Sequence, residues 1–276
     1  MARVLQPATR EALAALTERL DAYVDGASAR ELTATADELF AVARFLAGER
    51  PVQRLLADGA SPAESRVELV RSLLGRQLSE PTLDLVSELV RKRWSASGDV
   101  VTAAETLGRQ ATVAVAERNG SLDEVEDQLF RFGRILASEP ELTGLLADTT
   151  RPGDGRVELL DQVLGDRVYP VTASLLRQTV RMPRGRHLDV VAEELAELAA
   201  ARRDRSVAKV RTPVELTSQQ ESTLADTLGR IYGRPISLQV ELDRDLLGGL
   251  VVQVGGEVID GSVAGRLAAA RRSLPS

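Results

Sequence analysis

Two glycine pairs near the C-terminal end of the chain have the composition of a phosphate-binding loop. The stretch 245–262 reads DLLGGLVVQVGGEVIDGS and contains Gly248 with Gly249 and Gly255 with Gly256. A phosphate loop places its glycines between a strand and a helix, and a lysine and a hydroxyl residue follow to reach phosphate and magnesium. Here an alternating apolar run follows Gly249, and residues 210–276 contain no lysine. We therefore interpret one pair as a tight bend and the other as a hairpin turn, since glycine accepts positive φ angles.

The other residues that could act in catalysis or metal binding are scattered. His187 is the only histidine and the chain has no cysteine, which excludes histidine triads, multi-histidine metal sites and thiolate chemistry. We expect His187 to stand at the start of a helix. Two pairs of adjacent carboxylates fall on predicted helix faces near arginines, which indicates solvated ion pairs rather than a general acid and base. The pairs are Asp123 with Glu124 and Glu193 with Glu194. The sequence thus predicts no catalytic residue, cofactor site or metal site.

One cluster has the residue types needed to hold nucleic acid. The run RKRW, from Arg91 to Trp94, combines cations that attract phosphate with a ring that can stack on a base. Against this, aromatic residues make up only 3% of the chain and the formal net charge is −6. Such a charge opposes attraction to nucleic acid or anionic lipid. The competing interpretation is a solvated helix end with a packed tryptophan. A helical scaffold that binds nucleic acid or another protein through this cluster remains the second hypothesis.

Length and composition bound the class of protein. A chain of 276 residues with 43% hydrophobic and 28% charged residues can bury a sizeable core, divided among two or three domains. No stretch approaches the roughly 20 apolar residues that cross a bilayer, and no N-terminal segment has the pattern of a signal peptide. We therefore expect a protein that works in the cytosol and does not insert into a membrane.

Much of the helical part of the sequence occurs twice. The segment 39–58, LFAVARFLAGERPVQRLLAD, lies ninety positions before 129–148, LFRFGRILASEPELTGLLAD. When 39–101 is paired with 129–191, 24 of the 63 positions are identical, which indicates a duplication. The shared pattern is an apolar stripe at helical spacing, so each copy is predicted to be a bundle of about five or six helices.

Several helix positions can be assigned within the two copies. Capping-box patterns beginning at Ser28, Ser61 and Ser121 predict three helix starts. Further helices are predicted over 10–24, 80–93, 98–117, 168–181 and 187–205.

The pattern changes after Ser206, where apolar residues begin to alternate with polar ones. This two-residue period predicts strands over 208–216, 236–243 and 250–254, and a hairpin return at 258–259. Thr217 and Gln220 form the capping box of an intervening helix that ends near Gly233, and a last helix starts near Val263.

The predicted fold is mainly α with a small α+β C-terminal domain. Two tandem helical-bundle repeats, 1–99 and 100–205, precede a β-α-β-β-α unit over 206–276.

The C-terminal segment 246–274, LLGGLVVQVGGEVIDGSVAGRLAAARRSL, resembles the signature of the delta subunit family of bacterial F-type ATP synthase. This family is the counterpart of the mitochondrial oligomycin-sensitivity-conferring protein. Its signature runs from an apolar-Gly-Gly segment through a strand to a glycine turn, an apolar-Asp-x-Ser step and an apolar helix. The matching positions are Gly248, Gly249, Gly255, Asp260, Ser262 and Leu267. The second helical copy is similar to the family's N-terminal domain, and residues 1–99 look like its duplicate, as in the actinobacterial form.

The resemblance implies a non-catalytic peripheral-stalk, or stator, subunit. The helical domain would bind the N-terminal segments of the alpha subunits and the C-terminal domain would engage the b subunit, so that the catalytic head does not rotate with the rotor. It also implies a peripheral place at the cytoplasmic face of the cell membrane, within the complex, with no cofactor, nucleic acid or direct membrane insertion. We expect the second copy to contact alpha while the first copy braces the stalk. The sequence assigns no groove residue to either partner.

Overall fold

The computed structural model describes residues 6–232, 236–244, 246–254 and 257–264. Within these ranges the chain forms twelve helices and four strands, which confirms the expected mainly α chain with a small α+β part. It divides into two compact units, Met1–Leu198 and Ala199–Ser276. The finer division into three domains at residues 99 and 205 stays a prediction. No helix of the described ranges is both long enough and apolar enough to cross a membrane.

The duplication in the sequence is also a duplication of helix boundaries. Helices α3, α4 and α5 recur ninety positions later, residue for residue, as α8, α9 and α10. The helices of the first unit are α1 (Pro7–Gly26), α2 (Ala29–Gly48), α3 (Arg50–Ala57), α4 (Ala63–Leu74), α5 (Glu80–Arg91), α6 (Asp99–Arg118), α7 (Leu122–Ser138), α8 (Pro140–Ala147), α9 (Gly153–Leu164), α10 (Pro170–Arg181) and the start of α11 (Leu188–Ser206).

A buried arginine makes the same contact in each copy, with the end of a short helix. Arg66 and Arg156, ninety positions apart, are each 5% exposed. Arg66 donates to the carbonyl of Leu56 at 3.5 Å and Arg156 to that of Leu146 at 3.4 Å. These acceptors lie in the last turns of α3 and α8, where carbonyl groups have no partner within their helix. A repeated ion pair lies on the same elements: Glu64–Arg91 at 3.2 Å and Asp154–Arg181 at 2.8 Å.

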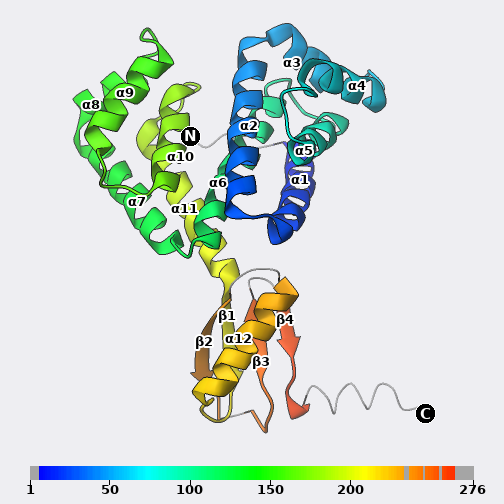
Figure 1. Cartoon of the computed structure of the whole chain (residues 1–276), viewed down its shortest axis with the longest axis vertical. Helices are drawn as coiled ribbons and strands as arrows, with labels where there is room; N and C mark the ends of the chain where they lie inside the picture. Colours follow the sequence, from blue (N-terminus) through cyan, green and yellow to red (C-terminus); the bar gives the residue numbers. More distant parts are fainter. Residues whose placement is uncertain (1–5, 233–235, 245, 255–256, 265–276) are drawn as a thin grey trace. The chain divides into compact units, whose positions relative to one another are not determined.

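Helix α6 belongs to both copies. In the ninety-residue register it corresponds to α11, the last helix of the second copy, and also to α1, the first helix of the first copy. Figure 1 shows it between α1–α5 and α7–α10, and its side chains are buried along most of its length. Gly108 allows α2 to approach it, because a Cβ atom there would lie 3.0 Å from the ring of Phe40. The two bundles therefore share one central helix.

One of the three helix caps predicted in this unit forms. The Ser28 hydroxyl accepts from the Glu31 amide at 3.3 Å, and the Glu31 carboxylate accepts from the Ser28 amide at 2.8 Å. The capping boxes predicted at Ser61 and Ser121 do not form, although α7 begins directly after Ser121 as expected. Pro62 takes the cap position before α4, and Ser121 has φ −118° and ψ 25° rather than the extended backbone of a capping residue.

The second unit is a mixed sheet covered on one face by a helix. Its elements are β1 (Val207–Thr212), α12 (Ser218–Tyr232), β2 (Ser237–Leu242), β3 (Val251–Val254) and β4 (Glu257–Asp260). The strand order is β2-β1-β3-β4, with β1 parallel to β2 and antiparallel to β3. Helix α12 lies across the sheet in Figure 1, and the buried core between them contains Ala208, Val210, Leu228, Ile236, Val252 and Val254.

Most of these elements lie where the sequence analysis predicted them. Thr217 and Gln220 form the expected capping box, with hydrogen bonds of 2.9 and 3.3 Å. Strand β1, however, ends at Thr212 rather than 216, because Pro213 has no amide hydrogen to continue the ladder. The β3–β4 hairpin pairs Val254 with Glu257. The predicted turn at 255–256, the cap at Gly233 and the last helix beyond 264 lie outside the described residues.

The first glycine pair forms the expected tight bend. Gly249 has a φ angle of +80°, and a Cβ atom there would lie 2.4 Å from the carbonyl oxygen of Gly261. The bend brings two backbone segments together, since the amides of Gly261 and Val263 donate to the carbonyls of Leu250 and Gly248 at 3.0 and 2.9 Å. Only glycine fits this position.

Replacement of Gly249 should therefore damage the C-terminal unit. Gly249→Val should lower its free energy of unfolding by at least about 2 kcal/mol, because the side chain meets backbone atoms at a positive φ angle. Thermal unfolding and amide exchange in β1 and β3 would measure the effect. Gly155→Ala in α9, where the added methyl meets open space, is the control. Unchanged exchange in β1 and β3 of Gly249→Val would contradict this account.

Candidate functional site

The structure places the candidate catalytic residues of the sequence analysis apart from one another. His187 directly precedes α11, as expected, is exposed, and accepts from the amide of Val191 at 3.0 Å through its carbonyl. Asp123 and Glu124 are exposed in the first turn of α7, and Glu194 forms an ion pair with Arg186. Over the described ranges, no group of three histidine, aspartate or glutamate residues is placed to hold a metal ion. Nothing in this arrangement unites an acid, a base and a nucleophile.

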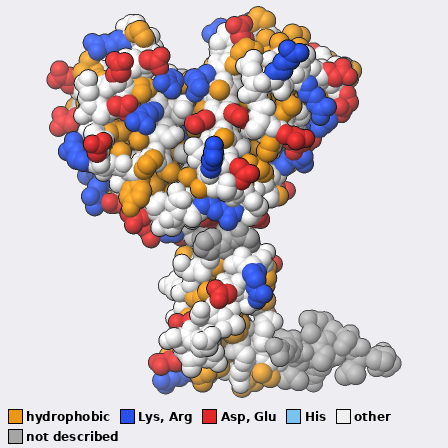
Figure 2. Space-filling view, in the orientation of Figure 1, with side chains coloured by type: hydrophobic (Ala, Val, Ile, Leu, Met, Phe, Trp, Pro, Cys, Tyr) orange, Lys and Arg blue, Asp and Glu red, His pale blue; other side chains and the backbone are white. Residues whose placement is uncertain are grey.

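The Arg91–Trp94 cluster is engaged within its own copy. Arg91 donates to Glu88 at 2.7 Å and to Glu64 at 3.2 Å, and these hydrogen bonds raise its pKa above the ordinary value. Trp94 is half-buried and donates from Nε1 to the carbonyl of Leu89 at 3.1 Å. Basic and acidic side chains alternate over the face of the helical unit shown in Figure 2. This arrangement favours the packed helix end over a surface for nucleic acid.

Most of the C-terminal signature residues meet at one turn. Asp260 accepts from the amide of Ser262 at 2.9 Å, and the hydrogen bonds from Ser262 lower the pKa of this exposed carboxyl. Ser262 itself is 3% exposed and lies against the backbone of Gly249. Gly255 and Leu267 fall outside the described residues. The described signature residues thus build the turn after the hairpin rather than a ligand site.

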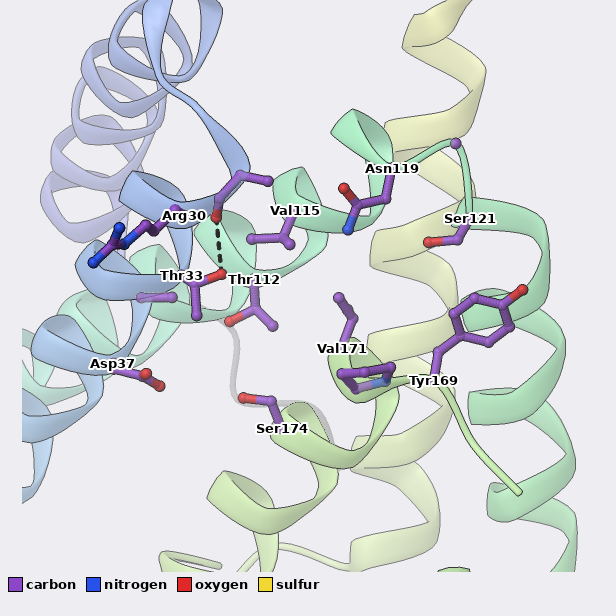
Figure 3. Close-up of a pocket in the computed structure, with 14 residues that line it drawn as sticks. Arg30, Thr33, Asp37, Thr112, Val115, Asn119, Ser121, Tyr169, Val171 and Ser174 are labelled. Atoms are coloured by element: carbon purple, nitrogen blue, oxygen red, sulfur yellow. Dashed lines mark hydrogen bonds between the residues drawn. The ribbon is translucent and has the colours of Figure 1, made fainter. Parts of the chain in front are cut away.

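A groove between the two copies is the strongest candidate for binding. It has a volume of about 440 Å³ and lies between α2 and α10, with α6 as its floor. Figure 3 shows Thr112 and Val115 of α6 between Thr33 of α2 and Val171 of α10. Its lining is largely apolar and comprises Ala29, Arg30, Thr33, Ala36, Asp37, Thr112, Val115, Asn119, Gly120, Ser121, Tyr169, Pro170, Val171 and Ser174.

Local sequence fixes the far wall of the groove. Pro170 occupies the first turn of α10, where its missing amide hydrogen costs nothing. Gln128 of α7 accepts from the Tyr169 amide at 2.9 Å and from the Thr172 hydroxyl at 2.8 Å. At the end of α6, Gly120 takes a φ angle of +65° and turns the chain into α7. The start of α10 is therefore held in place beside α6.

Asp37 is the one carboxylate among the residues that line this groove. In Figure 3 it is directed toward the space between α2 and α10, whereas the guanidinium of Arg30 points away. Asp37 is an exposed residue, but its place against the groove partly desolvates the carboxyl and raises its pKa above the ordinary value of 3.8, and the nearby charge of Arg44 partly offsets this. Arg44 itself donates to Gln178 of α10 at 2.7 Å and so bridges the two copies. Asp37 accepts no hydrogen bond from the described residues.

In the first copy, charged residues occupy two of the positions equivalent to the lining of this groove. The counterparts of Val115 and Ser174 ninety positions earlier are Asp25 and Asp84. Asp84 of α5 forms an ion pair with Arg19 of α1 at 2.6 Å, which bridges the surface equivalent to the α6–α10 wall. The groove was not found by the sequence analysis. The difference in residue type between the two copies at these positions was the one sign of it in the sequence.

Known proteins resemble the chain along its whole length. The model of the family described as ATP synthase delta (OSCP) subunit matches residues 109–274. Proteins named ATP synthase subunit delta from Streptomyces avermitilis and Streptomyces coelicolor are each 46% identical over 269 residues, covering 98% of both chains. A protein named ATP synthase subunit b-delta from Mycobacterium sp. (strain KMS) is 45% identical over 271 residues, or 98% of this chain. The chain spans 61% of the length of that relative.

Neutralisation of Asp37 should stabilise the free chain at neutral pH. Its folded-state pKa is raised, so its contribution to stability is present at low pH and is lost as the pH rises through that pKa. Asp37→Asn should therefore raise the thermal midpoint at pH 7 only slightly, by less than about 1 °C because water screens this exposed carboxylate, and the gain should shrink toward pH 4. Asp127→Asn is the control. It removes an ion pair with Arg131 at 2.9 Å, so it should not raise the midpoint. A lower midpoint for Asp37→Asn at pH 7 would contradict the assignment.

Proposed function

The chain belongs to the ATP synthase delta (OSCP) subunit family, whose members are structural rather than catalytic, and we propose that it is a peripheral-stalk subunit of an F-type ATP synthase. Its helical unit holds the N-terminal segment of an alpha subunit and its C-terminal unit engages the b subunit. The catalytic head is thereby prevented from rotating with the rotor. In this role the chain lies at the cytoplasmic face of the cell membrane, held there by its partners.

The groove over α6 is the observation that carries the alpha contact. A partner helix recognised in this way lays apolar side chains at positions i, i+3 or i+4 and i+7 into a hydrophobic groove. Val115 and Val171 supply an apolar floor and wall, and a volume of about 440 Å³ accommodates several side chains. The groove contains α6 and α10 of the second copy, which supports the assignment of the alpha contact to that copy.

Exposed apolar side chains of the C-terminal unit support the contact with b. Leu247, in the loop before β3, is 84% exposed, and Val258 on the edge strand β4 is 59% exposed. Each offers an apolar side chain that a partner could cover. The Mycobacterium relative carries both subunit names, b and delta, which supports a close association of these parts.

Two separate contacts suit a joint that must hold under torque. When one contact forms, the other becomes effectively intramolecular, so the combined affinity exceeds that of either unit. A chain with one contact in each compact unit meets this requirement without any catalytic group.

A charge placed in the groove should weaken the alpha contact. Ser174→Arg adds a desolvated cation to an apolar wall, so the Kd for a peptide of the same organism's alpha-subunit N-terminus should rise at least tenfold, or about 1.4 kcal/mol. Isothermal titration calorimetry measures this. Ser138→Arg, at an exposed position at the end of α7, serves as the control. Failure of the unaltered chain to bind the peptide would remove the basis of the proposed function, and equal binding by Ser174→Arg would refute the groove.

A polar change on the C-terminal unit should affect only the b contact. Leu247→Asp should weaken binding to the soluble part of the b subunit by about tenfold and leave alpha-peptide binding unchanged, because the two contacts lie in different units. Thr223→Asp on the exposed face of α12 controls for added charge. Loss of both contacts, or of neither, would argue against the division of roles between the units.

A further inference from the structure

The groove has one wall that the common part of the family does not supply. The matched family model begins at residue 109, within α6, and therefore contains α6 from that point and α10 but not α2. Helix α2 belongs to the first repeat copy, yet it lines the groove through Ala29, Arg30, Thr33, Ala36 and Asp37. A helix that docks on α6 and α10 therefore also meets a surface from the duplicate.

Asp37, the charge on that added wall, lacks the ion-pair partner that the equivalent residue of the second copy has. Asp127, ninety positions after Asp37, pairs with Arg131 one turn later on α7 at 2.9 Å. The position that corresponds to Arg131 in the first copy is occupied by Ala41. Asp37 thus has no cation at the i+4 position of its own helix, the spacing that stabilises such pairs. Arg44, whose charge acts on Asp37, donates its hydrogen bond to Gln178 instead.

An exposed carboxylate at the edge of an apolar groove favours one kind of occupant. A docked helix that buries apolar side chains against Val115 and Val171 would shield Asp37 further from water. A neutral or acidic residue facing it would leave that charge uncompensated, whereas a lysine or arginine would pair with it. Charge complementarity of this type acts mainly on the choice of partner.

We propose that the first repeat copy completes the alpha-binding groove and that Asp37 selects a docked helix with a basic residue opposite it. This inference rests on the proposed function and adds to it a role for the duplicate: α2 is a specificity wall, in addition to any bracing of the stalk. The occupant is an amphipathic helix with an apolar face and one cation at its edge, supplied by the alpha-subunit N-terminus.

Calorimetry with variant chains and variant peptides tests the inference. Asp37→Lys should raise the Kd for the alpha N-terminal peptide about tenfold. In peptides in which each basic residue is replaced in turn by glutamate, one replacement should weaken binding to the unaltered chain and restore binding to Asp37→Lys. Asp127→Lys, the matched change in the second copy, should leave the Kd unchanged. Circular dichroism of each variant verifies that the helices are intact.

A second variant keeps Asp37 and gives its charge a partner on the same helix. Ala41→Arg recreates in the first copy the Asp127–Arg131 spacing of the second, so Asp37 should pair within its own helix. The variant should be at least as stable as the unaltered chain and yet bind the peptide several-fold more weakly. A general structural role for Asp37 predicts the opposite, with stability and binding changing together.

The outcomes separate this inference from the proposed function. If the unaltered chain binds the peptide and Ser174→Arg does not, the proposed function stands. If Asp37→Lys and Ala41→Arg then bind as tightly as the unaltered chain, or if no basic residue of the peptide responds to Asp37→Lys, the selective role of Asp37 is overturned. If the unaltered chain fails to bind, the proposed function itself falls.

Discussion

The helical unit depends on the burial of α6 by two sets of neighbours. An ordinary surface helix needs one apolar stripe, but α6 must present a packing surface in nearly every direction. Small residues such as Gly108 let α2 approach closely, and its charged groups find partners where they are buried. Glu105, 6% exposed, pairs with Arg109 on the same helix and with Arg184 at 3.1 Å. Burial lowers the pKa of Arg109, and the nearby charge of Glu105 opposes this shift. The same carboxylate therefore fastens the turn before α11 to α6.

Sharing of α6 explains why the groove exists at all. Two complete bundles side by side would each cover their own first helix. Here α2 and α10 both pack on α6 from different sides, and the hollow between them is lined from both copies. The Arg44–Gln178 hydrogen bond spans the copies at one place, and the shorter side chains near Thr112 and Ser174 leave space at another. The groove is thus a product of the duplication, not a property of either copy alone.

The sequence predicted those features that rest on local patterns. The apolar stripes and the caps at Ser28 and Thr217 depend on residues within a few turns of one another, and they are found where expected. The ninety-residue repeat is visible because each copy keeps these local patterns. The cap at Ser61 was displaced by Pro62, and β1 ended before Pro213, because proline imposes its own backbone and lacks an amide hydrogen. The groove could not be predicted in this way, since its walls are separated by more than 130 residues and come together only in the folded chain, against α6. The change from Arg131 to Ala41 was visible, but its meaning required the fold.

The shared helix also imposes an order on synthesis. Helices α1 to α5 leave the ribosome before α6, so α6 can complete the first bundle as soon as it emerges, while the partners on its other side have not yet been made. The side of α6 that is still uncovered at that stage is the side against which α7 and α10 pack in the folded chain. A change that displaces α6 within the first bundle therefore also displaces the surface on which the second bundle packs.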